Sequence, residues 1–120
     1  MKSSRAYIIF LCVAMLLLAS CGQQYAAKQK VKEFVKQHAT EEIDITSFSD
    51  LDSTRVISDS LLQAMRKTAL NDPLFKDVRL GDIPKSPTLL YIRMRYGEDS
   101  LMLSKTFYFD RDLNEIIAFK

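Results

Sequence analysis

Histidine and cysteine are scarce in this chain of 120 residues, and the single histidine, His38, is the first residue to consider for catalysis or metal binding. Three carboxylates follow it closely, those of Glu41, Glu42 and Asp44. An imidazole beside carboxylates has the composition of an acid–base pair or of a site for a hard metal ion. A histidine at the end of a helix, followed by a solvated acidic loop, is the commoner arrangement, and it is the interpretation that we favour.

The other common catalytic patterns are missing from the sequence. A Ser-His-Asp triad could use only His38, and a zinc site built from several histidines is excluded by composition. The sequence contains neither a GxGxxG nor a Walker pattern. The acidic run at Asp50 starts like a calcium loop, but Arg55 and Leu61 stand where the glycine and the closing glutamate belong. We therefore predict no catalytic residue, no cofactor and no metal site.

The N-terminal residues follow the order of a secretory signal. Lys2 and Arg5 form a short basic start, and an apolar run occupies residues 6–19. This run is shorter than the roughly 20 apolar residues that cross a bilayer, so an uncleaved anchor is the weaker alternative. A plain secretory signal that ends after Ala19 or Ser20 is a second alternative.

The end of this segment, Leu18-Ala19-Ser20-Cys21, resembles the lipobox of bacterial lipoproteins. That resemblance implies cleavage before Cys21, a diacylglyceryl group on its sulfur and, usually, acylation of the new amino terminus. The chain then divides into a cleaved signal peptide at residues 1–20, a lipidated N-terminus with a short tether at 21–26, and a single domain at 27–120. The whole also resembles the small lipoproteins of Bacteroidetes that have no assigned function.

Removal of the signal would change the charge of the chain. The full sequence has a net charge of +2, and Lys2 and Arg5 are the only charged residues before Cys21, so the mature chain would be neutral. A global electrostatic case for nucleic-acid binding is therefore lost. By resemblance to lipoprotein sorting, position 22 is glycine and not the aspartate that marks inner-membrane retention. The early acidic residues that accompany surface export in Bacteroidetes are also missing, since the first acid after Cys21 is Glu33. We expect an outer-membrane lipoprotein that faces the periplasm.

Residues 25–38 have the spacing of an amphipathic helix. The residues on its apolar face are Ala27, Val31, Phe34, Val35 and His38. Lysines recur every four residues on another face, at Lys28, Lys32 and Lys36. This basic face is either a solvated surface or, as the sharper hypothesis, a contact with anionic headgroups beside the lipid anchor.

A second helix should begin near Ser58-Asp59-Ser60 and end before Pro73, with Ser60 or its rival Ser58 as the N-cap. Its expected inner face consists of Leu61, Met65, Thr68 and Ala69, widened by Leu62. Before it, alternation predicts a strand with Ile43, Ile45 and Ser47 on one side, followed by a polar loop at 49–53. After it, Val78 and Leu80 suggest a short strand.

The clearest strand signals are residues 88–96 and 101–109, and a third strand is expected at 115–119. A four-residue loop at 97–100 would place Tyr96 opposite Leu101. Asn114 should take the left-handed conformation in the second turn, and the register of the last strand remains open. The sequence thus predicts an α+β fold, with two helices packed on an antiparallel sheet that ends in a three-strand meander. Small domains with cystatin-like, NTF2-like and PepSY-like folds resemble this arrangement in the order of their elements.

In that register four side chains share the hairpin face opposite to the apolar one: Tyr91, Arg93, Arg95 and Tyr108. Planar aromatic rings and guanidinium groups suit a protein partner or an acidic polymer. The alternative is a solvated sheet face with ordinary cross-strand pairs. We therefore predict a membrane-tethered envelope lipoprotein that is a non-catalytic binding or scaffolding module with a protein partner. The competing hypothesis is a small periplasmic enzyme, or an accessory subunit of one, with a carboxylate- or tyrosine-based site.

Overall fold

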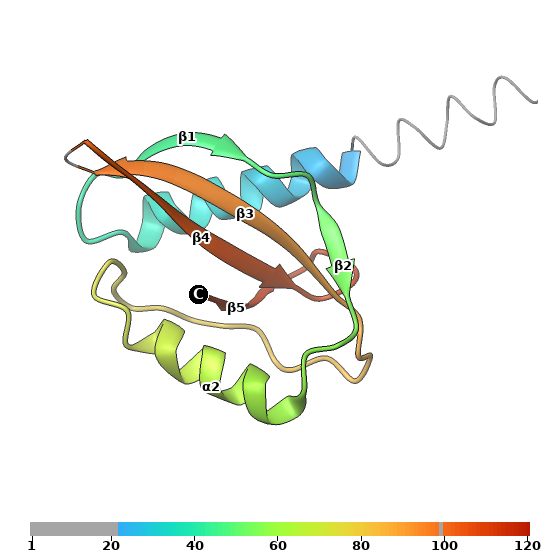
Figure 1. Ribbon diagram of the computed structural model, residues 1–120. Helices are drawn as coiled ribbons and strands as arrows, with labels where there is room; N and C mark the ends of the chain where they lie inside the picture. Colours follow the sequence, from blue (N-terminus) through green and yellow to red (C-terminus); the bar gives the residue numbers. More distant parts are fainter. Residues whose placement is uncertain (1–21, 99) are drawn as a thin grey trace, which may run out of the picture.

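The computed structural model describes residues 22–98 and 100–120, apart from the side chain of Glu98, and the signal segment with Cys21 lies outside the described residues. The described chain forms two helices and a five-stranded antiparallel sheet (Figure 1), so the predicted α+β class is confirmed. The elements in chain order are a helix at residues 22–38, β1 (Asp44–Phe48), β2 (Asp52–Thr54), α2 (Asp59–Leu70), β3 (Leu89–Glu98), β4 (Leu101–Phe109) and β5 (Ile116–Phe119).

The long strand β3 is the centre of the sheet. On one side it pairs with β4, and on the other side β1 and β2 pair with different parts of it, so the order is β1-β3-β4-β5 with β2 also on β3. The helix at residues 22–38, called the first helix below, lies behind β1 and β3 in the view of Figure 1, whereas α2 lies at the bottom beside β5. The two helices therefore pack on different parts of the sheet.

The first helix has the predicted inner face except at His38, which is only partly buried. Ala27, Val31, Phe34 and Val35 are all buried, and they join the main core cluster with the apolar side of β3 and β4. Phe34 is central to this cluster because its ring contacts those of Phe75, Phe107 and Phe119, with centroid distances of 5.1, 5.8 and 5.4 Å. Residues 22–26, expected as a short tether, are helical as well.

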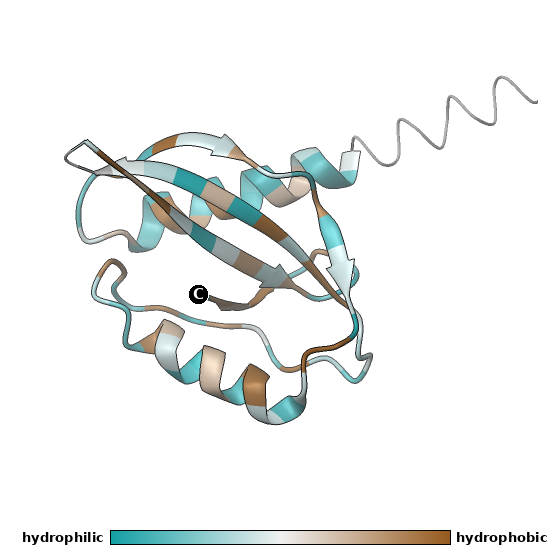
Figure 2. Cartoon of the chain, viewed as in Figure 1, coloured by the Kyte–Doolittle hydropathy of each residue, from teal (hydrophilic) through white to brown (hydrophobic). Residues whose placement is uncertain are grey.

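The hairpin of β3 and β4 has a tighter turn than the sequence suggested. Tyr96 lies opposite Leu103, not opposite Leu101, and Glu98 pairs with Leu101. Ser100 supplies the positive φ of 72° that tight hairpins require. A slip of two residues leaves every side chain on its predicted face, because the side-chain period of a strand is two. Figure 2 shows the resulting alternation of hydrophobic and hydrophilic residues along β3 and β4.

The prediction for β1 was wrong at its second half. The register shifts between Ile45 and Ser47, so Phe48 takes the inward place that the alternation had given to Ser47. Phe48 is partly buried against the main core, whereas Ser47 is exposed. A β-bulge of this kind adds one residue and reverses the alternation beyond it. The predicted polar loop at 49–53 was also wrong in part, since β2 begins at Asp52.

Two of the residues predicted for the inner face of α2, Leu61 and Thr68, are exposed. The buried residues are Leu62, Met65 and Ala69, and Leu61 is 47% exposed. The N-cap is the rival residue Ser58, whose hydroxyl accepts a hydrogen bond from the backbone N–H of Leu61 at 3.2 Å. The predicted inner face and the observed one both have helical spacing and share Met65, so periodicity alone did not distinguish between them.

Two further local predictions were wrong. Residues 78–80 are an irregular segment and not a strand, and Gly81 after them is held to β5 by its N–H bond to the carbonyl of Ile116 at 2.9 Å. In the last turn Leu113, not Asn114, has the positive φ, of 56°. Leu113 is buried there, so packing into the core accompanies the unfavourable backbone conformation.

The open register of the last strand is now defined. Phe119 lies opposite Phe107 and faces the first helix, whereas Ala118 lies opposite Tyr108. Ile117 and Ala118 join the second core cluster under α2. Arg66 of α2 fastens this end, because its Nη1 donates to the carbonyl oxygens of Gly81 and Ile117 at 2.6 and 2.8 Å.

Candidate partner-binding surface

The four residues predicted to face a partner all lie on the same side of the hairpin. The cross-strand pairs on this side are Tyr91–Tyr108, Arg93–Thr106 and Arg95–Ser104. Side chains alternate along a strand, so this side is opposite to the one that packs against the first helix. The structure therefore places these residues together, but their exposure differs along the hairpin.

The two tyrosines lie at the end of the hairpin near α2. Their ring centroids are 5.8 Å apart and the rings are tilted by 38°. Tyr108 is buried in the second core cluster with Leu62 and Met65 of α2, and Tyr91 packs beside that cluster, partly buried. Tyr108 is thus a core residue, and Tyr91 forms the boundary between the core and the exposed part of the face.

The environment raises the pKa of both phenols. For Tyr91 the main cause is the negative charge of Asp52, whose Oδ2 accepts the phenolic hydrogen bond at 3.4 Å, and partial desolvation adds to it. For Tyr108 burial raises the pKa, and the positive charge of Arg93 opposes this effect in both rings. The two rings therefore act here as neutral aromatic groups with a hydroxyl.

Arg93 and Arg95 lie beyond the tyrosines and are exposed. The hydroxyl residues Ser104 and Thr106 stand opposite them on β4, and we call these four residues the arginine face. Among the described side chains no carboxylate lies within 4.0 Å of either guanidinium group. Both planar donor groups are thus presented to solvent on a strand that is paired on both sides.

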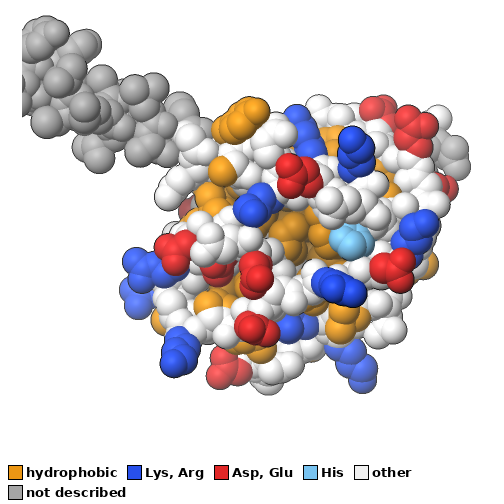
Figure 3. Space-filling view, turned by 180° about the vertical axis from the view of Figure 1, so that it is seen from behind, with side chains coloured by type: hydrophobic (Ala, Val, Ile, Leu, Met, Phe, Trp, Pro, Cys, Tyr) orange, Lys and Arg blue, Asp and Glu red, His pale blue; other side chains and the backbone are white. Residues whose placement is uncertain are grey.

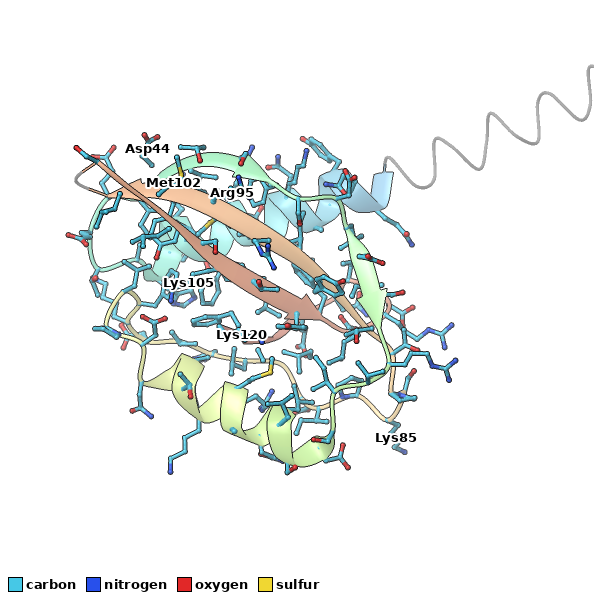
Figure 4. The ribbon with its side chains drawn as sticks, in the orientation of Figure 1. Asp44, Lys85, Arg95, Met102, Lys105 and Lys120 are labelled. Carbon is cyan, nitrogen blue, oxygen red and sulfur yellow. The ribbon has the colours of Figure 1, made fainter. Side chains whose placement is uncertain are left out.

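Residues of β1 and of the segment after it extend the arginine face, and the sequence did not indicate them. Ser49 is bonded to Arg93 twice, since its hydroxyl accepts from the N–H of Arg93 at 2.8 Å and its own N–H donates to the carbonyl at 2.9 Å. The bulge residue Thr46 donates to the carbonyl of Arg95 at 3.2 Å and contacts the sulfur of Met102 at 3.5 Å. Figure 4 shows Met102 and Arg95 close together, with Asp44 beside them. Alternation had put Asp44 and Thr46 on a polar side, but only strand pairing reveals which face they join.

The acid–base or metal cluster at His38, which was the less favoured interpretation of the sequence, is not assembled as a site. His38 Nδ1 donates to the carbonyl oxygen of Lys76 at 3.0 Å, and its ring lies on Phe34 with a centroid distance of 4.7 Å. Glu41 and Glu42 instead line an open hollow of about 390 Å³ with Asp44 and Tyr96, and these acids are exposed. No three His, Cys, Asp or Glu residues come together to hold a metal ion within the described ranges.

The lysines of the first helix differ in their contacts. Lys30 Nζ donates to the carbonyl oxygen of Asn114 at 3.1 Å, so it ties the helix to the last turn. Lys32 lies over the ring of Phe48, with Nζ 6.0 Å from its centroid. Lys36 is exposed and Lys28 partly so. Lys30, which is not part of the basic face, thus fastens the helix to the last turn, whereas Lys32 and Lys36 of the basic face are exposed.

Cys21, the predicted lipid attachment site, is outside the described residues. Within the part of the chain that is described, neither helix has the length and apolar character to cross a bilayer. No protein-family model, no curated protein and no solved structure matches this chain.

Proposed function

We propose that this chain is an envelope lipoprotein, tethered by lipid on Cys21, whose folded domain is a non-catalytic binding or scaffolding module. The observation that carries the tether is Leu18-Ala19-Ser20-Cys21 at the end of a basic-then-apolar segment. The binding role is supported by the arginine face, an exposed sheet surface with two guanidinium groups that have no carboxylate of the described residues within 4.0 Å.

The chemistry of this surface favours a partner that carries carboxylates. A guanidinium group presents a planar fork of N–H donors that matches a carboxylate in bidentate geometry. Arg93 and Arg95 project from one strand two residues apart, with the hydroxyls of Ser104 and Thr106 opposite them. We therefore infer an acidic segment of a protein as the partner, bound across β3 and β4.

The tether is tested by metabolic labelling with a fatty acid. Replacement Cys21→Ser should abolish the label and leave a precursor or a differently cleaved form, because no other cysteine remains after the signal. Cys12→Ser is the matched control, since it removes a thiol from the apolar run and should leave labelling intact. Label retained in the Cys21→Ser protein would contradict the proposal.

The expected location is the periplasmic side of the outer membrane. Protease added to intact cells should leave the protein whole, and the same protease should digest it once the outer membrane is permeabilised. Digestion in intact cells would instead place the domain on the cell surface.

The binding face is tested with a photo-crosslinking residue in the full chain in cells. Introduced at Arg93 or Arg95, it should give a discrete protein adduct, and at exposed Lys67 of α2 it should give none. A crosslinking residue at position 104 leaves both arginines in place. Adding the charge-reversing substitutions Arg93→Glu and Arg95→Glu should abolish its adduct without lowering the melting temperature. Equal adducts from positions 67 and 93 would show that the arginine face is not a specific site.

A further inference from the structure

The N-terminal end of the first helix is hydrogen-bonded to the segment between β1 and β2. Gln24 Nε2 donates to the carbonyl of Ser49 at 2.9 Å, and Gln24 Oε1 accepts from the backbone N–H of Leu51. Ala27 and Val31, one and two turns further on, have no exposed surface. The helix is therefore fastened to the sheet from Gln24 onward.

This attachment point is three residues from the cysteine proposed to carry lipid. Whatever conformation the intervening residues adopt, three residues span at most about 11 Å. The lipidated sulfur would lie at the level of the headgroups, since the acyl chains occupy the bilayer. The rigid domain must then lie against the membrane surface, and the question is which side faces it.

One side of the first helix has suitable chemistry for anionic lipid. Tyr25, Lys32 and Lys36 are spaced at i, i+7 and i+11, so they lie along one line, on the side away from the buried face. Tyr25 is 65% exposed, and tyrosine is enriched at the level of headgroups because its ring is apolar and its hydroxyl polar. Figure 3, seen from the side of the first helix, shows an apolar side chain protruding beside the start of the grey chain, with basic groups and an acidic group nearby.

The end of the molecule beside the anchor is less suitable for contact with an anionic membrane. Asp50 lies between the two residues that Gln24 binds, and Asp52 follows at the start of β2; both are exposed. An anionic surface would repel these carboxylates and attract Lys32, Lys36 and the flanking Lys28. Charge complementarity therefore favours an orientation with the helix along the surface over one with the helix standing on its end.

We propose that the first helix lies along an anionic bilayer surface, with Tyr25, Lys32 and Lys36 facing the headgroups. This inference rests on the proposed lipid attachment at Cys21. The arginine face is on the opposite side of the sheet, so this orientation turns Arg93 and Arg95 away from the membrane and towards a partner. The tether and the binding face then act together, because the anchor sets the direction in which the face is presented.

The chain has no tryptophan, so a single introduced tryptophan reports its own position. The experiment uses the purified mature protein that begins at Cys21, its lipid verified by mass, in vesicles of phosphatidylglycerol and phosphatidylcholine with bromine on the acyl chains. Tyr25→Trp and Lys36→Trp should each lose about half of their emission if the helix lies at the interface. Leu61→Trp on the outer side of α2 is the control and should be unaffected, as Leu61 is 47% exposed and lies outside both core clusters.

The lipid composition separates the two orientations. In vesicles of phosphatidylcholine alone, quenching at position 36 should weaken while quenching at position 25 persists, because lipid alone holds the anchored end. When Lys28→Gln and Lys32→Gln are added to the Lys36→Trp protein, quenching at position 36 should also weaken in anionic vesicles. Adding Lys67→Gln instead should leave this quenching unchanged. Quenching at position 25 with none at position 36 would overturn the proposed orientation, and so would equal quenching at position 61. Absence of acyl groups in the purified protein would instead contradict the proposed tether, and this inference with it.

Discussion

The two faces of the β3–β4 hairpin differ in how they are covered. The side that carries Ile92, Met94, Phe107 and Phe109 is closed by the first helix, and all four residues have no exposed surface. The other side is closed only at one end, where α2 covers Leu89 and Tyr108, and it is open from Arg93 to Met102. The same two strands thus form a core on one side and a surface available to a partner on the other.

This difference separates stability from recognition. Burial of apolar side chains is the main favourable term in folding, so the closed side determines whether the domain folds. Exposed polar positions contribute little, and substitutions there usually change stability by less than about 0.5 kcal/mol. Residues one position apart on the same strand should therefore respond to truncation in very different ways.

The largest expected effect is on the closed side. Phe107 is fully buried and its ring contacts Phe34 and Phe119, so Phe107→Ala should lower the free energy of unfolding by about 3–5 kcal/mol. Met102 on the same strand is 62% exposed, and Met102→Ala should cost less than about 0.5 kcal/mol. Urea denaturation measures both. Similar losses for the two variants would show that the faces are not as different as their burial indicates.

A smaller effect is expected at Lys105, a charged residue among the described side chains of the closed side. Lys105 points to this side and forms an ion pair with Asp72, with side-chain exposures of 17% and 13%. Asp72 Oδ1 also accepts from the N–H of Leu74 at 2.9 Å. Asp72→Ala removes both interactions and leaves a partly buried ammonium without its partner, so it should cost about 1–3 kcal/mol.

Two matched variants distinguish these contributions. Asp72→Asn keeps an acceptor for Leu74 and should cost less than Asp72→Ala. Lys105→Met removes the charge but keeps the apolar stem, so it should be the mildest of the three. The same urea experiment ranks them, and Lys105→Met as the most harmful change would contradict this account.

The closed side could be predicted from the sequence because its signal is redundant. Alternation in both strands and helical spacing in residues 27–35 indicate the same buried set, and an error of two residues in the hairpin register leaves the faces unchanged. The errors occurred where a single residue decides the outcome. The bulge at Thr46 exchanged Ser47 for Phe48, and a shift of one residue in α2 exchanged Leu61 for Leu62. Neither exchange is indicated by a sequence pattern that extends beyond its own strand or helix.

The candidate surface was predicted less completely. Sequence spacing put Tyr91, Arg93, Arg95 and Tyr108 on one face, but it gave no means to place α2 over Tyr108. Ser49 and Thr46 joined the surface through the pairing of β1 with β3, which links residues more than forty positions apart. Contacts of this range depend on the tertiary fold, and no local pattern encodes them.

The smallest effect concerns Tyr91, at the boundary between the covered and the open part of the second face. The charge of Asp52 raises the pKa of Tyr91 above its ordinary value of 10.0. The folded state thus favours the protonated phenol, so the stabilisation is complete below the pKa of an unfolded tyrosine, about 10, and is lost as the pH rises through the higher folded value. Asp52→Asn should lower the pKa of Tyr91 towards the ordinary value, visible as the difference in phenolate absorbance between each protein and its Tyr91→Phe counterpart. Asp50→Asn is the matched control in the same segment and should change this titration less. If the Tyr91 titration is the same with aspartate and asparagine at position 52, then the ring is solvated like the arginines beside it, and the boundary of the open face lies at Tyr108 instead.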